Sequence, residues 1–157
     1  MIEQISDFFT LEMIYLWLNI GVLPFWFVLI FFPQTNICRY IVTSIIPILI
    51  LSSIYIYLIF IFYKSGYDFV KNFNLYMGLN QLGKLFEKES FLILFWIHFI
   101  SINLFCGSWI VKDSQKYSVS KILISIPLIV TYFVGPFGIV LYWFERIFFA
   151  KKIGLYD

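Results

Sequence analysis

Four long runs without Asp, Glu, Lys or Arg dominate the chain, at positions 13–32, 41–63, 91–111 and 122–144. A helix that rises about 1.5 Å per residue needs roughly 20 residues to cross the roughly 30 Å hydrocarbon core of a bilayer. None of the runs alternates apolar and polar residues as strands do, and a spanning segment must satisfy its own backbone hydrogen bonds. The pattern therefore predicts an all-α, polytopic membrane protein of one domain (residues 1–157) with four transmembrane helices.

A segment of mixed polarity, 64–90, separates the second and third runs. Leucine and phenylalanine recur in it at spacings of four, three and four, which is the repeat of one helix face: Leu75, Leu79, Leu82 and Phe86. Charged side chains on the other faces favour a short interfacial helix between the second and third transmembrane helices. Ser90 is then available as the N-cap of the third helix. The alternative is a solvated loop.

The distribution of Lys and Arg predicts the orientation, because cytoplasmic segments are enriched in basic residues. In a four-helix protein the N-terminus, the segment 64–90 and the C-terminus share one side of the membrane. That side holds seven basic residues (Lys64, Lys71, Lys84, Lys88, Arg146, Lys151 and Lys152), and the two short turns hold four (Arg39, Lys112, Lys116 and Lys121). Both termini are therefore predicted on the inner side of the membrane.

The composition agrees with a membrane protein. The chain is 62% hydrophobic and 13% charged, with a mean hydropathy of +0.92, whereas a soluble domain is about 45–50% apolar and about 25% charged. A net charge of +2 with scattered basic residues argues against nucleic acid, so the lipid bilayer is the predicted partner. One histidine and two cysteines, Cys38 and Cys106, give no metal site or disulfide framework, and we expect both thiols to be free.

Prolines occur in three of the four runs, at Pro24, Pro47, Pro127 and Pro136. Each lacks a backbone donor and favours a kink. Pro136 lies in the sequence GPFG, so the fourth helix is predicted to be bent or broken near its middle. Two interpretations stay open: such residues are common in membrane helices, or the break makes room for a ligand.

His98, the only histidine, lies about seven residues into the third run, roughly 10 Å deep. At about 100° per residue, Ser101 and Ser108 lie near its stripe, while Asn103 is about 140° away. The polar groups therefore do not converge on one face, which argues against a catalytic dyad within this helix. His98 is interpreted either as a strut between helices or as a ligand contact or general acid/base. In both cases we expect it to be buried, because an imidazole in hydrocarbon lacks hydrogen-bond partners.

Several short motifs, in this order and spacing, resemble one membrane-protein family. The residues that carry the likeness are LPFW (23–26), His98, NLF (103–105), Trp109, Asp113 and GPFG (135–138). The family includes the plastid protein required for neoxanthin synthesis in plants and small cyanobacterial relatives. The resemblance covers most of the chain, from about residue 13 to residue 150.

The resemblance implies a set of site residues. His98 and Asp113 are the candidate catalytic residues, and the candidate ligand-binding residues are Asn103, Trp109, Gly135, Pro136, Gly138 and Pro24. No metal is implied. The family pattern has His, then Asp five residues on, then Arg after five more. Here Asn103 and Ser108 stand where those two charged residues are expected, so both members of the charged pair are absent together.

The resemblance also implies xanthophyll chemistry, in which opening of a 5,6-epoxide gives an allene and requires an acid and a base. The replacement of both charged residues weakens the interpretation as a neoxanthin-forming isomerase. It leaves a carotenoid-binding protein, with the carotenoid as substrate or ligand. The alternative is a non-enzymatic small subunit or assembly factor of a photosynthetic membrane complex. The implied location is the thylakoid or another cyanobacterial or plastid membrane.

Overall fold

The computed structural model describes residues 10–151, 153 and 154. Within those residues it contains helices and no strand, as predicted for an all-α protein. The chain divides into two compact units, each formed by two stretches of sequence: unit 1 (Met1–Gly21 and Ile50–Phe99) and unit 2 (Val22–Leu49 and Ile100–Asp157). The expectation of one domain over residues 1–157 stays a prediction.

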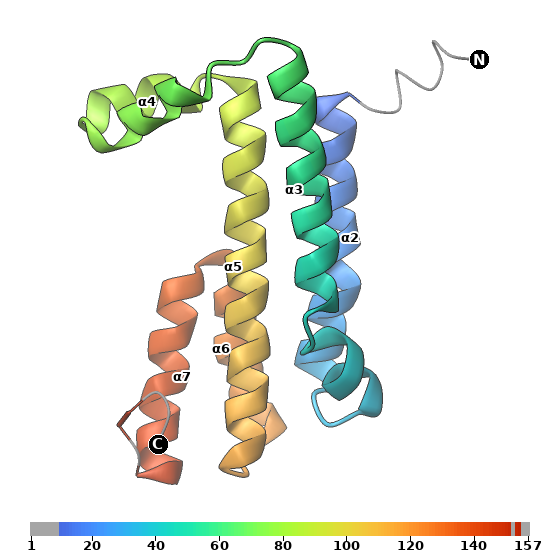
Figure 1. The fold of residues 1–157 in the computed structure, drawn as a ribbon. Coiled ribbons are helices and arrows are strands. Elements are labelled where there is room, and N and C mark those ends of the chain that lie inside the picture. Colours follow the sequence, from blue (N-terminus) through green and yellow to red (C-terminus); the bar gives the residue numbers. More distant parts are fainter. Residues whose placement is uncertain (1–9, 152, 155–157) are drawn as a thin grey trace. The chain divides into compact units, whose positions relative to one another are not determined.

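Three helices are long enough and apolar enough to cross a membrane (Figure 1): α2 (Leu11–Phe31), α3 (Ile46–Lys64) and α5 (Glu89–Lys116). They correspond to the first three predicted spans. Large apolar side chains are exposed along each of them, for example Trp17 and Ile56. Continuous exposed apolar surface of this kind marks contact with lipid or with another protein.

The second span begins later than the sequence indicated. Residues Cys38–Val42 form a π-helical turn, and α3 begins at Ile46. Pro47 therefore lies in the first turn of α3, where its missing N–H removes no intrahelical hydrogen bond. Pro24, by contrast, lies inside α2.

Between α3 and α5, unit 1 contains the 3₁₀ helix η2 (Phe69–Tyr76) and the helix α4 (Leu79–Phe86). A short helix was predicted here, and α4 is shorter than the apolar repeat because Leu75 lies in η2. The predicted N-cap is wrong: α5 begins at Glu89, so Ser90 already lies inside its first turn. The position of α4 in the membrane interface stays a prediction.

The fourth predicted span is not a single helix. Residues 122–144 are divided between α6 (Lys121–Phe133) and α7 (Gly135–Ala150). Val134, between them, has φ −139° and ψ 76°, outside the helical region, and Pro136 in the first turn of α7 lacks the N–H that would continue α6. The predicted break at GPFG is confirmed. A fourth membrane-crossing helix is not confirmed, because neither α6 nor α7 is among the helices long and apolar enough to cross a membrane.

Within unit 2, α6 and α7 form a hairpin that returns to the end of α5 (Figure 1). At its tip, the side-chain amide of Asn103, in α5, donates to the carbonyl of Tyr132 at 3.3 Å. At its open end, Arg146 Nε lies 2.8 Å from Asp113 Oδ2, near the end of α5. The arms contain 13 and 16 residues, so they are about 20 and 24 Å long. Each arm is therefore shorter than the roughly 30 Å hydrocarbon core.

The two arms of the hairpin meet closely at Gly138. A β-carbon at this position would lie 2.5 Å from the backbone nitrogen of Thr131 and 2.7 Å from the carbonyl oxygen of Pro127. Thr131 is fully buried, and its hydroxyl donates to the same carbonyl at 2.7 Å. Any side chain at position 138 must therefore push α6 and α7 apart.

Gly138→Ala is expected to destabilise unit 2 by about 1–3 kcal/mol, because two of the clashing atoms belong to the backbone and cannot rotate away. Gly21→Ala is the matched control, since no heavy atom lies within 4 Å of its added methyl, and alanine favours a helix over glycine. Thermal unfolding of the two purified variants in detergent, followed by tryptophan fluorescence, measures the difference. Equal midpoints would contradict the close packing at Gly138.

Both cysteines, Cys38 and Cys106, are free in the structure, as expected. Cys38 lies outside the three long helices and is fully buried, and this burial raises the pKa of its thiol to about 11. Because the thiolate is the reactive form, Cys38 should resist iodoacetamide at pH 8 in the folded protein and react once the protein is denatured. Peptide mass spectrometry without reductant measures the labelling. Rapid labelling of folded protein at Cys38 would contradict its burial.

Candidate functional site

The sequence-predicted site residues fall into separate groups. Asn103 and Gly135 meet at the hairpin tip of unit 2. Trp109 and Asp113 both contact one residue of α7 near the end of α5, also in unit 2. His98 lies in unit 1. The structure therefore does not unite all the candidates in one site.

Asn103 joins the middle of α5 to the hairpin tip. Its side chain is only 4% exposed, and besides donating to Tyr132 it presents its Oδ1 to Gly135, where a β-carbon would collide with that oxygen. A side chain at position 135 would therefore displace the amide of Asn103. A neutral amide offers a donor and an acceptor but no ionisable proton at neutral pH. The geometry suits Asn103 to holding the tip against α5.

An apolar groove of about 290 Å³ lies between α2 and α6, beside this tip. Its walls are large apolar and aromatic side chains: Leu23, Trp26, Phe27, Ile30, Ile129, Tyr132 and Phe133. Trp26 and Tyr132 form an edge-to-face pair, with ring centroids 5.4 Å apart and an interplanar angle of 76°. Tyr132 thus belongs to the groove through its ring and to the hairpin tip through its carbonyl.

Gly107 on α5 fixes the position of the Trp26 ring. A β-carbon at Gly107 would lie 2.8 Å from Cη2 and 2.9 Å from Cζ3 of that ring. The glycine therefore lets the indole pack directly against the backbone of α5, where it is only 3% exposed. Small residues allow this kind of close approach between membrane helices.

The second group surrounds Asp113. The carboxylate is 8% exposed, and one of its oxygens, Oδ2, accepts a hydrogen bond from the Tyr142 hydroxyl at 2.7 Å. The same oxygen lies 2.8 Å from Nε of Arg146, whose side chain is fully buried. Trp109 packs edge-on against the Tyr142 ring, with centroids 5.6 Å apart. The ion pair of Asp113 and Arg146 therefore joins α5 to α7.

The two terminal nitrogens of Arg146 bond to other residues. Nη2 donates to the Tyr117 hydroxyl at 3.2 Å, and Nη1 donates to the carbonyl of Gly154. The guanidinium carbon lies 4.9 Å from the centroid of the Tyr117 ring, in cation–π geometry. The Tyr142 hydrogen bond and the Arg146 ion pair both fall on Oδ2 of Asp113. The arrangement suits structural clamping of the hairpin.

Residues 13–142 match the family described as ABA DEFICIENT 4-like. The chain belongs to this family. It is 30% identical over 124 residues to "Protein ABA DEFICIENT 4, chloroplastic" from Arabidopsis thaliana, an alignment that covers 73% of this chain and 56% of that protein. The chain thus spans little more than half the length of this plant relative. No solved structure matches the chain.

Two positions where the family resemblance leads one to expect charge carry Asn103 and Ser108. The Ser108 hydroxyl donates to the carbonyl of Val42 at 3.4 Å, while Asn103 bonds to Tyr132. The two side chains therefore reach different elements, as their positions on the helix indicated. Each bonds to the backbone, so neither leaves a charge stranded in the protein.

His98 is exposed on α5, and the prediction that it is buried between helices is wrong. Near the start of this helix, the ring of Phe86, the last residue of α4, lies 5.5 Å from Phe91 and 4.8 Å from Phe95. His98 lies about one turn further along, beyond these aromatic contacts.

Three other predicted ligand-binding residues, two prolines and a glycine, lie outside the groove between α2 and α6. Pro24 and Pro136 are exposed on α2 and α7, and Gly138 is buried at the packing contact within the hairpin. Among the residues that the structure describes, no three His, Cys, Asp or Glu side chains come close enough to hold a metal ion. Ligand binding by these three residues stays a prediction.

Sequence analysis missed the role of Arg146, which was assigned to a C-terminal segment outside the membrane. A signal was present: Tyr142 and Arg146 are four residues apart, so they lie on one face of a helix. An arginine that continues an apolar run also points to a buried partner. The identity of that partner, Asp113, depends on the return of the hairpin to α5, which the hydrophobic pattern did not show.

Proposed function

We propose that the protein binds a carotenoid in a plastid or cyanobacterial membrane, and that the groove between α2 and α6 holds one end of it. The observation that carries the proposal is the groove itself, an apolar cleft with aromatic walls in a chain of the ABA DEFICIENT 4-like family. The resemblance implied by the motifs connects this family with neoxanthin, a xanthophyll. A flat, apolar ring suits such walls.

The size of the groove limits what it can hold. About 290 Å³ is at the lower end of ligand sites, which span roughly 300–1,000 Å³. The groove therefore accommodates an end ring, and the polyene chain extends along the helices into lipid.

The chemistry of the lining favours binding over isomerisation. Epoxide opening requires a general acid and a general base within reach of the reacting atoms. The described residues that line the groove include no carboxylate, histidine or lysine. Asn103 cannot exchange a proton at neutral pH, and Asp113 is held by Tyr142 and Arg146. Xanthophyll isomerisation is therefore the second candidate, favoured by family membership alone.

The test is co-expression of the chain with a carotenoid pathway, mild detergent purification and chromatography of the extracted pigments. Ile129→Trp fills the groove, while Ile126→Trp adds the same bulk to an exposed position of α6 outside it. We expect the wild type and Ile126→Trp to retain carotenoid and Ile129→Trp to lose at least about 90% of it. A loss of about 1.4 kcal/mol in binding free energy already lowers the affinity tenfold.

Two results would overturn the proposal: no carotenoid on the wild-type protein, or equal pigment on both variants. Incubation with an epoxy-xanthophyll separates binding from isomerisation, because a binding protein returns the pigment unchanged. Protein analysis of the same preparation addresses the alternative of a small subunit, which predicts a stoichiometric membrane partner.

A further inference from the structure

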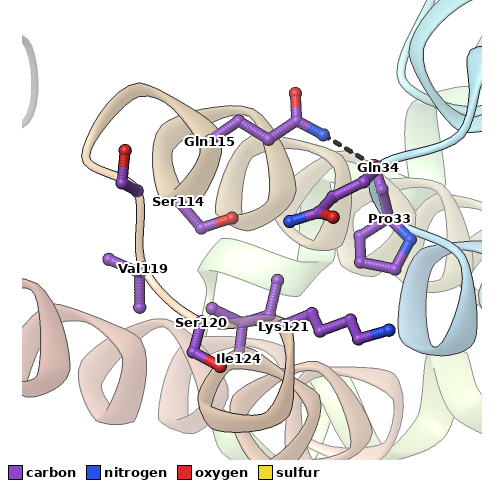
Figure 2. A pocket seen from close by; sticks show the side chains of 9 residues that line it. Pro33, Gln34, Ser114, Gln115, Val119, Ser120, Lys121 and Ile124 are labelled. Carbon is purple, nitrogen blue, oxygen red and sulfur yellow. Dashed lines mark hydrogen bonds between the residues drawn. The ribbon is translucent and has the colours of Figure 1, made fainter.

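A second cavity, of about 320 Å³, lies in unit 2 where α2 and α5 end and α6 begins (Figure 2). Serine, glutamine and lysine side chains make up most of its lining. It shares no lining residue with the groove between α2 and α6. The cavity is therefore a separate and chemically different site.

Hydrogen bonds fix two walls of this cavity. Gln115, in the last turn of α5, donates its Nε2 to the carbonyl of Pro33 at 2.6 Å, which ties α5 to the chain directly after α2. Ser120 caps α6 by accepting a hydrogen bond from the N–H of Ile122 at 3.4 Å. Both walls are therefore parts of the folded structure.

Long polar side chains with unused hydrogen-bonding groups face this space. Within the described residues, neither the amide of Gln34 nor the ammonium of Lys121 bonds to another side chain or carbonyl. Figure 2 shows Gln34 directed toward Ser114, which is 1% exposed. The Ser114 hydroxyl donates to the carbonyl of Val111 at 2.7 Å, so its oxygen is still available as an acceptor.

The surroundings of the cavity are positively charged. Its lining includes Lys121 and, among the described residues, no Asp or Glu. The neighbouring carboxylate of Asp113 is neutralised by Arg146. The described part of unit 2 carries six basic side chains (Arg39, Lys112, Lys116, Lys121, Arg146 and Lys151) and two acidic ones (Asp113 and Glu145). Such a charge balance favours an anion.

The ends of two apolar helices predict that the cavity lies at the depth of lipid headgroups. The apolar helix α2 ends at Phe31, two residues before the cavity wall at Pro33. The apolar part of α5 ends at Val111, immediately before Lys112. Basic pockets between membrane helices at this depth bind anionic headgroups. We propose that the cavity binds the phosphate or sulfate headgroup of an anionic membrane lipid, with Lys121 as its charged contact and Gln34 as a neutral donor.

The test uses native mass spectrometry of the purified protein with phosphatidylglycerol or phosphatidylcholine. We expect retention of phosphatidylglycerol over phosphatidylcholine, and an about tenfold loss of that retention in Lys121→Gln, as for one charge-assisted hydrogen bond. Lys112→Gln is the matched control, since it removes the same charge from an exposed position of α5 outside the cavity. Lys121→Arg keeps the charge and should retain the lipid.

Equal losses in Lys121→Gln and Lys112→Gln would overturn the proposal, because they would indicate general surface attraction. Equal retention of both lipids by the wild type would overturn it as well. Inorganic phosphate distinguishes the source of the anion. If phosphate binding requires Lys121 while retention of phosphatidylglycerol does not, the ligand is a soluble anion and the lipid assignment is wrong. None of these readouts depends on carotenoid in the other groove.

Discussion

Arg146→Leu is expected to destabilise unit 2 by about 3–5 kcal/mol, the largest effect of any single substitution considered. The substitution leaves Asp113, 8% exposed, without its counter-charge, and an unpaired buried charge costs about this much. It also removes the donors to Tyr117 and Gly154. Thermal unfolding in detergent, followed by tryptophan fluorescence, should show a large drop in midpoint, since Trp109 packs against Tyr142 in the same cluster.

Two further variants separate the ion pair from general effects of mutation. Lys112→Leu removes a cation from an exposed position of α5 and should change stability by less than about 0.5 kcal/mol. The double variant Asp113→Leu with Arg146→Leu removes both charges and should regain much of the lost stability. A double variant as unstable as the sum of the two single variants would contradict direct coupling between Asp113 and Arg146.

Reporter fusions after Ser118 and at the C-terminus are expected to report the same side of the membrane. The hairpin of α6 and α7 ends beside the end of α5, where the ion pair of Asp113 and Arg146 lies. A single fourth helix would instead place these fusions on opposite sides. A third fusion, near Gly66 after α3, should report the opposite side. The reason is that α5, which connects this segment to Ser118, is long enough to cross the membrane.

With a hairpin in place of a fourth span, the count of basic residues predicts the opposite orientation. It moves Arg146, Lys151 and Lys152 to the side that holds Arg39, Lys112, Lys116 and Lys121, so this side now carries seven basic residues and the other carries four. By the positive-inside rule, the C-terminus is expected in the cytoplasm or stroma and the N-terminus on the opposite side. Residues 1–9 lie outside the described part of the chain. Opposite signals from the fusions after Ser118 and at the C-terminus would exclude the hairpin.

The sequence predicted the three long helices because length and hydropathy determine which segments can cross a bilayer. It also predicted the break at GPFG from the chemistry of Gly135 and Pro136. What it could not supply was the direction of the chain after that break. Two short apolar helices and one kinked long helix give nearly the same hydropathy. The contact that decides between them, Asp113 with Arg146, joins residues far apart in the sequence.

For the candidate site, too, the sequence predicted some features and not others. Asn103 and Gly135 were selected from motifs, and the structure brings them into contact. His98 was expected to be buried on the argument that an imidazole needs partners, but the burial of one helix face depends on which neighbours cover it. Here α4 contacts α5 at Phe91 and Phe95. The hydrophobic pattern of α5 does not show which of its residues contact a neighbouring helix.

The short arms of the hairpin also constrain how the protein is made. Neither α6 nor α7 is long enough to stay in a bilayer as an independent stop-transfer segment, and α7 brings Arg146 with it. We therefore expect the hairpin to enter the membrane as one piece, after α5 has been inserted and can offer Asn103 and Asp113 as partners. A chain that ends before Arg146 would leave Asp113 without its counter-charge, so we expect the hairpin to pack against α5 only once residue 146 has been made.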